Sequence, residues 1–282
     1  MSSANAPPPA DASVQPSLFI PHGGGPCFFM EWTMGPYDTW DSMAAWLRGL
    51  AATLPERPKA VVVISGHWEE DTFAVTSGAN PPLIYDYYGF PDHTYDLTYK
   101  ASGAPELARR IVAMLTKAGL PGRADDKRGF DHGVFIPFKL IFPAADIPIV
   151  QVSLHTDLDP GRHLDLGRAL APLRREGVLI VGSGMSYHNM AGFGDPRSRA
   201  VSRDFDDWLT NSVTRTSATA RNEALNNWAE TPTARAVHPR EEHLMPLMVA
   251  AGAAEEEPGE KIFADYPMEV AISAFRFGPA AP

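Results

Sequence analysis

The chain has 282 residues but almost no cysteine and no long apolar segment, and both absences limit what it can be. Cys27 is its single cysteine, so an intrachain disulfide cannot form and zinc sites built from several thiolates are excluded. A chain of this kind suits a reducing compartment. The strongly apolar stretches are short, as in residues 60–64, and fall far below the roughly 20 residues that cross a membrane.

An excess of basic residues and a secretory signal are also missing. The formal net charge is −10, which argues against a nucleic-acid binder because such proteins usually present a basic face. The first sixteen residues are small, polar and rich in proline, without a basic segment followed by an apolar one. We therefore expect a flexible N-terminal tail over residues 1–16, no membrane segment, and a cytoplasmic protein.

After this stretch, short apolar runs alternate with amphipathic segments, a pattern typical of α/β proteins. The expected strands cover residues 17–20, 60–64, 148–154, 177–181 and 269–275. The expected helices cover about residues 40–54, 104–118, 161–175, 198–217 and 241–251. No internal repeat and no long linker divides the chain, so residues 17–282 are expected to form one catalytic domain.

Three of the expected strands run directly into a loop that carries a histidine. His22 follows the first strand, His67 the second, and His188 the strand over residues 177–181. In open α/β sheets, ligands bind beyond the carboxyl ends of the strands. We therefore expect these three histidines to meet at one edge of the sheet.

The other histidines divide into candidates and structural residues. His132 and His243 lie in motifs that favour a functional role, whereas His163 is expected to be structural and His155 to lie at a pocket rim. The spacings match no compact zinc signature, so a metal site would have to be assembled from distant segments.

Residues 239–243 are expected to form the first turn of a helix. Proline near the start and two acids in the first turn suit a helix N-terminus. Stabilisation of the helix dipole therefore explains Glu242 better than a role as metal ligand or as partner of a ligand.

Five short motifs and one aromatic loop occur in a fixed order along the chain. They are Pro21-His22-Gly23-Gly24, Gly66-His67-Trp68, Tyr85-Asp86-Tyr87-Tyr88-Gly89-Phe90-Pro91, Asp131-His132-Gly133, Ser186-Tyr187-His188-Asn189 and Glu242-His243-Leu244-Met245-Pro246-Leu247. Together they resemble the DOPA-dioxygenase branch of the class III (LigB-like) extradiol ring-cleavage dioxygenases.

The resemblance implies a single α/β domain with a central mixed sheet flanked by helices. It also implies one divalent metal per chain, with Fe(II) for activity and Zn(II) in isolated or crystallised relatives. Carried over by motif, His22, His67 and His243 would be metal ligands. His188 would lie beside the metal, as a fourth contact or as the catalytic acid/base, and His132 would be the second catalytic histidine.

Residues outside the metal set are candidates for substrate binding. Tyr88 and Phe90 could line an aromatic pocket or pack as core, and His238 could touch substrate or help to cap the last helix. Arg128 and Lys139 flank the His132 loop and could bind a substrate carboxylate, but ordinary surface charge explains them better.

The resemblance therefore implies a non-haem Fe(II)-dependent extradiol dioxygenase, whereas the residues alone indicate a site rich in imidazole. Its substrates would be O₂ and a small aromatic diol, either DOPA-like or another substituted catechol, and a homo-oligomer would be compatible with the sequence. Two other classes stay open. One is a zinc-dependent hydrolase, in which the metal activates water. The other is a non-catalytic metal-binding interaction protein similar to the Memo-like family.

Overall fold

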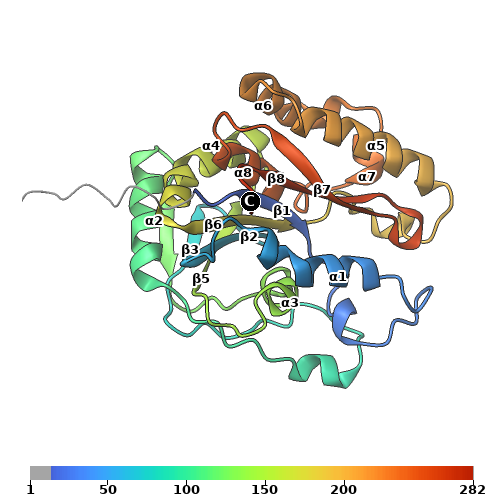
Figure 1. Ribbon diagram of the computed structural model, residues 1–282, viewed down its shortest axis with the longest axis horizontal. Helices are drawn as coiled ribbons and strands as arrows, with labels where there is room; N and C mark the ends of the chain where they lie inside the picture. The colour runs from blue at the N-terminus through green and yellow to red at the C-terminus, as the bar shows by residue number, and fades with distance from the viewer. Residues whose placement is uncertain (1–13, 282) are drawn as a thin grey trace, which may run out of the picture.

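A computed structural model describes residues 14–281, which form an eight-stranded mixed sheet between helices (Figure 1). The strand order is β4-β3-β5-β2-β6-β1-β8-β7. The central strands β5, β2, β6 and β1 are parallel to one another, whereas β8 runs antiparallel to both β1 and β7. The predicted α/β fold with a central mixed sheet is confirmed.

The strands are short and, in the centre of the sheet, apolar and buried on both faces. Their bounds are β1 Ser17–Pro21, β2 Ala60–Glu70, β3 Phe73–Thr76, β4 Gly122–Asp125, β5 Ile149–His155, β6 Val178–Gly184, β7 Gly259–Asp265 and β8 Ile272–Phe277. Each of the five predicted strands overlaps one of these, while β3, β4 and β7 were not predicted.

The α-helices cover both faces of the sheet. Their bounds are α1 Asp41–Leu50, α2 Pro105–Lys117, α3 His132–Ile141, α4 Pro160–Leu170, α5 Ser198–Val213, α6 Ala218–Asn226, α7 Ala234–Val237 and α8 Met245–Ala253. The five predicted helices correspond to α1, α2, α4, α5 and α8. No described helix is long and apolar enough to serve as a membrane span.

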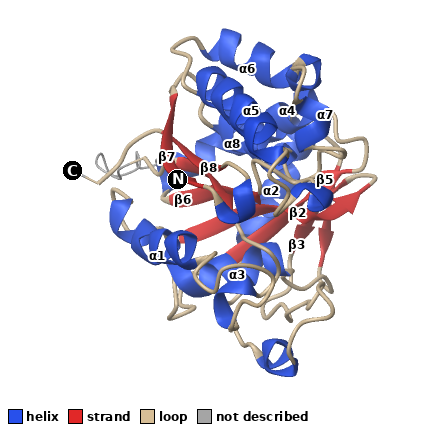
Figure 2. Cartoon of the chain, turned by 90° about the vertical axis from the view of Figure 1, so that its right-hand side faces the viewer, coloured by secondary structure: helices blue, strands red, loops and turns tan. Residues whose placement is uncertain are grey.

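The helices form two layers, as Figures 1 and 2 show from perpendicular directions. α1 and α3 pack together on one face, with α3 against β2 and β6. α8 lies on the other face against β6, β1 and β2, and α4 packs on α8. α8 is apolar all round and completely buried, as expected for a helix enclosed between the sheet and a second helix.

The predicted tail lies mostly outside the described residues, which begin at residue 14. Gln15 is buried: its backbone N–H donates to the Arg174 carbonyl at 3.0 Å, and Arg174 Nε donates to the Gln15 carbonyl at 2.7 Å. Pro16 is buried as well, so the packed part of the chain begins before residue 17.

Candidate metal centre and active site

Three histidines meet where β1, β2 and β6 end. His22 follows β1 directly, and its backbone N–H donates to the Gly184 carbonyl at the end of β6. His67 lies within β2, in the stretch where the register between β2 and β5 shifts. Such an irregularity re-aims a side chain, and here it brings His67 toward the other two. His243 lies in the turn before α8 and its carbonyl accepts from the Met185 N–H at 3.0 Å.

Gly184 lets the His243 segment approach the sheet. A Cβ added at residue 184 would overlap the carbonyl oxygen of His243. Only glycine therefore permits the backbone contact that sets the position of His243 against the end of β6.

The three side chains offer nitrogens within 4.8 Å of one another, a spacing suited to one shared cation. Nε2 of His67 and Nε2 of His243 are 3.1 Å apart, and Nε2 of His22 is buried without a hydrogen-bond partner. Burial, with repulsion from neighbouring histidines, holds the pKa of each ring well below its ordinary value. Neutral imidazoles whose nitrogens converge fit a divalent metal ion, and the unpartnered Nε2 of His22 adds to this fit.

An oxygen atom faces the opposite nitrogen of each ring, at hydrogen-bond distance for His22 and His243 and slightly farther away for His67. His22 Nδ1 lies 3.1 Å from the Gly23 carbonyl oxygen, His67 Nδ1 lies 3.5 Å from Asp86 Oδ2, and His243 Nδ1 lies 2.9 Å from Glu242 Oε1. An acceptor at Nδ1 fixes the tautomer that carries its proton there and leaves the Nε2 lone pair free for a metal.

The same two carboxylates also hold the other two histidines. His132, the first residue of α3, places Nδ1 2.8 Å from Asp86 Oδ1, and His188 places Nδ1 3.0 Å from Glu242 Oε1. Burial alone would raise the pKa of each carboxyl group, but hydrogen bonds and neighbouring charges, led by the bond from His132 or His188, together outweigh it and the pKa is lowered. Asp86 and Glu242 are therefore ionised and can only accept hydrogen bonds.

His188 stands beside the trio rather than within it. Its ring stacks on that of His243, with 3.4 Å between the centroids and 19° between the planes. It belongs with Glu242 and His243 to a second group of potential ligands, separate from the group that His22, His67 and His243 form. The ring of His132 lies 4.0 Å from that of His67.

The five histidines line a cavity of about 520 Å³ that opens to solvent. Tyr88 and Phe90, predicted to contact substrate, also line it. Its remaining walls are aromatic side chains, methionines, the loop glycines and Asp86. The cavity therefore combines an imidazole-rich end with apolar walls.

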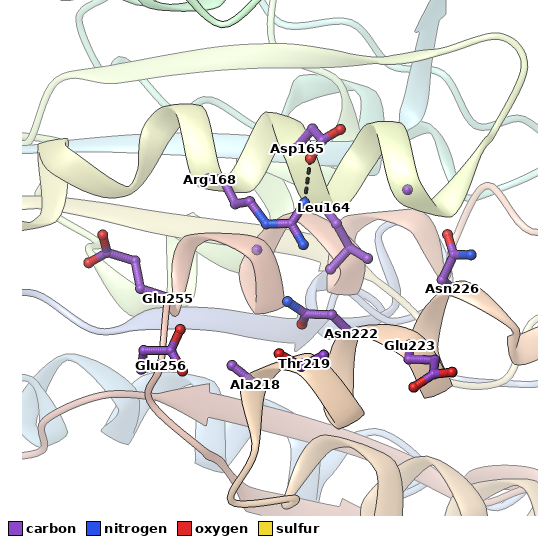
Figure 3. A pocket seen from close by; sticks show the side chains of 12 residues that line it. Leu164, Asp165, Arg168, Ala218, Thr219, Asn222, Glu223, Asn226, Glu255 and Glu256 are labelled. Carbon is purple, nitrogen blue, oxygen red and sulfur yellow. Dashed lines mark hydrogen bonds and ion pairs between the residues drawn. The ribbon is translucent and has the colours of Figure 1, made fainter.

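A larger hollow of about 760 Å³ lies between α4 and α6 and carries no histidine (Figure 3). Its wall bears the carboxylates of Asp165, Glu223, Glu255 and Glu256, and Arg168 is already bonded to Asp165. It offers no group suited to acid/base work near neutral pH, so the smaller cavity is the candidate active site.

The comparisons with known proteins agree with this geometry. The family model described as the catalytic LigB subunit of aromatic ring-opening dioxygenase matches residues 17–276, nearly the whole chain. The chain belongs to the LigB family. The predicted class, an aromatic ring-opening dioxygenase, is thereby confirmed.

Several curated relatives of this LigB-family chain are named as dioxygenases. It is 38% identical to dioxygenase tasH of Hapsidospora irregularis over 94% of this chain and 86% of that one. It is 43% identical to the 4,5-DOPA dioxygenase extradiol of Beta vulgaris, covering 71% of this chain and 75% of the relative. A crystal structure of an uncharacterized protein from Escherichia coli K12 matches with a TM-score of 0.74 and 29% identity, over 94% of this chain and 100% of that one.

His238 does not line the cavity of this LigB-family chain, contrary to its predicted contact with substrate. Its side chain is completely buried beside the rings of Phe205 and Trp228, and its Nε2 lies 3.0 Å from the Ser186 carbonyl. The predicted contact with substrate is wrong because His238 is the C-cap residue of α7, where its side chain is buried in the core. We therefore assign His238 a packing role.

The burial of His238 makes a testable prediction for stability. Desolvation lowers the pKa of His238 to about 3, whereas an unfolded histidine titrates near 6.5. Between these values the unfolded chain binds one more proton, so the free energy of unfolding falls as pH decreases from 6.5. In His238→Gln, which keeps a donor for Ser186, this decrease should be shallower by about 1.4 kcal/mol per pH unit. Denaturant unfolding at several pH values measures it, and equal slopes would contradict it.

The other sequence expectations near the site need two corrections. The last helix begins at Met245, so His243 lies in the preceding turn and not in the first turn of a helix. Glu242 holds His188 and His243 instead of only stabilising a helix dipole. Arg128 donates to Asp131 and Lys139 to the Thr98 carbonyl, and neither lines the cavity.

Asp86 lies within the aromatic loop, where the sequence predicts no role for it. Its contacts with His67 and His132 could not be predicted, because both histidines are far from residue 86 in the sequence and no spacing pattern connects them. Only the fold brings them together.

Replacing Asp86 by asparagine should weaken metal binding without unfolding the chain. The amide cannot hold both Nδ1–H groups as an ionised carboxylate does, so the affinity for Zn(II) should fall about 10- to 100-fold. Competition with a chromophoric chelator measures the dissociation constant. Asp92→Asn, at an exposed acid, is the matched control and should bind like the parent. An unchanged affinity in Asp86→Asn would contradict the role of this carboxylate.

Proposed function

We propose that this chain is an Fe(II)-dependent extradiol dioxygenase that cleaves the ring of a catecholic substrate with O₂. The observation that carries the proposal is the convergence of three neutral imidazoles at one end of an apolar cavity, with two further histidines beside them. Residues 17–282 would act as one catalytic domain. The names of the plant relatives, 4,5-DOPA dioxygenase extradiol, support the reaction class.

His22, His67 and His243 would hold the metal. Imidazole ligands suit Fe(II), and three of them bring no negative charge to the site. When bound, Fe(II) would supply a Lewis-acidic centre that favours the anionic form of the diol and brings the diol together with O₂. Zn(II) fits the same donors but is not redox-active.

His188 would be the acid/base of the reaction. Glu242 accepts from its Nδ1, so Nε2 is the nitrogen left to accept a proton from a diol hydroxyl. An imidazole suits both acceptance and later return of that proton at neutral pH. Its position beside the trio supports this role over that of a fourth metal ligand.

His132 would orient the substrate. Asp86 holds its Nδ1 and also accepts from its backbone N–H at 2.9 Å, which fixes the ring at the start of α3. Its Nε2 is then left to bond an oxygen atom of the substrate. Tyr88 and Phe90 would contact the aromatic ring or its substituent from the cavity wall.

The proposed reaction consumes one diol and one O₂. One ring carbon–carbon bond beside the diol breaks, and both oxygen atoms enter the product as part of an aldehyde and a carboxylate. The substrate supplies all the electrons, so no external reductant is needed.

Isotopically heavy dioxygen tests this balance directly. Mass spectrometry of the product formed by the iron-loaded chain should find one heavy atom in the new carboxylate and the other in the aldehyde of the same ring-opened molecule. The aldehyde label is lost in those molecules whose aldehyde oxygen has exchanged with water. A product whose added oxygen comes only from water would contradict the proposal and favour a hydrolase.

A further inference from the structure

The cavity is larger than a catechol ring requires. A cavity of about 150 Å³ holds benzene, whereas this one measures about 520 Å³. Besides the histidines, its lining includes the apolar side chains of Trp32, Trp40, Met185, Phe193 and Met268. A substituent on the ring therefore meets apolar walls.

The mouth of this cavity is apolar as well. Met34, Tyr88 and Met190 line it, with 58%, 90% and 69% of their surfaces exposed. Met34 and Tyr88 lie in two separate loops and Met190 begins a short 3₁₀ helix. Few other large apolar side chains of residues 14–281 are exposed to this degree. Exposed apolar side chains gathered around one opening mark a binding surface rather than scattered surface residues.

No lysine or arginine is among the described residues that line the cavity, and Asp86 is the acid there. Two arginines near the histidines are not part of this lining, and each already bonds an acidic side chain. Arg240 bonds the carboxylate of Glu69 at 2.5 Å and 2.6 Å, and Arg128 donates to Asp131 at 3.3 Å. A substrate carboxylate in the apolar part would lose its hydration without gaining a cationic partner.

We propose that the preferred substrate is a catechol whose ring substituent is neutral and apolar rather than one that carries a free carboxylate. The inference rests on the proposed function only in placing the diol at the histidines. The choice of substituent rests on three other features of the cavity: its apolar walls, its apolar mouth, and the absence of lysine and arginine from the described residues that line it.

Three catechols that share a three-carbon side chain test the preference: propylcatechol, dihydrocaffeic acid and the methyl ester of that acid. Binding to the Fe(II)-loaded chain is measured under nitrogen by quenching of tryptophan fluorescence, since Trp32 and Trp40 line the cavity. The two neutral ligands should bind at least about tenfold more tightly than the acid. Equal or tighter binding of the acid would overturn the inference.

Admission of oxygen to the same samples separates this inference from the proposed reaction. Tighter binding of the neutral pair supports the substituent preference whether or not oxygen is then consumed. Absence of oxygen uptake with all three ligands overturns the proposed reaction alone.

A cation placed at the mouth should reverse part of the preference. In Met190→Lys, the ratio of the dissociation constants of the acid and its methyl ester, called the gap here, should fall about tenfold. The reason is that an ammonium group now faces the carboxylate. Tyr37→Lys is the matched control: Tyr37 is 81% exposed but does not line the cavity, so its gap should stay as in the parent. An unchanged gap in a folded Met190→Lys variant would contradict the role of the apolar mouth.

Discussion

Replacing His67 by alanine should reduce the metal content of the chain from about one ion per molecule to nearly none. The remaining histidines, His22 and His243, cannot complete a three-ligand site, and Asp86 loses one of the rings that it holds. When one of three protein ligands is lost, the two that remain bind a divalent metal ion only weakly. Dialysis then removes the ion. Elemental analysis after reconstitution and dialysis measures the outcome.

A matched histidine variant separates ligand loss from a general effect. His93 is exposed and its Nε2 contacts only the Phe29 carbonyl, so His93→Ala should retain its metal. Thermal unfolding monitors whether His67→Ala is folded. Full metal retention in a folded His67→Ala chain would remove His67 from the ligand set.

Replacing His188 by alanine should lower kcat by about 10²- to 10⁴-fold, the usual contribution of a positioned acid/base. The trio of ligands stays intact, so metal content should stay near that of the parent. The KM for the catechol should change little, because removal of a proton acceptor affects mainly the chemical step. Steady-state oxygen uptake and elemental analysis measure the two quantities.

Two outcomes would contradict this role of His188. An unchanged kcat would remove His188 from the mechanism, and loss of the metal would assign it to the ligand set instead. Glu242→Gln is the companion variant, because it keeps His188 but weakens the contact that holds its Nδ1. We expect its kcat to lie between that of the parent and that of His188→Ala.

The buried strands and the longer helices could be predicted because their patterns are local. The runs at β1, β2 and β6 are apolar without interruption, and proline at the first position of α2 marks its start. β7 was missed because its strand is only half buried and lacks an apolar run. α3 was missed because Pro137 lies within it and its residues are apolar all round.

The candidate ligands could be proposed from motifs, but the groups that orient them could not. His22, His67 and His243 stand in short recognisable segments, whereas the contacts of Asp86 depend on the position of α3 relative to β2. Glu242 had a sufficient local explanation as a helix-start acid, and only the structure places it against two rings. The burial of His238 in the core could not be predicted from the sequence either.

Anaerobic reconstitution with Fe(II), followed by addition of a catechol and then oxygen, tests the central claim most directly. We expect oxygen uptake that matches the catechol consumed and a yellow ring-opened product, with neither when Zn(II) replaces Fe(II). Full iron occupancy with no oxygen uptake for any catechol would contradict the account and favour a hydrolase or a non-catalytic metal-binding protein.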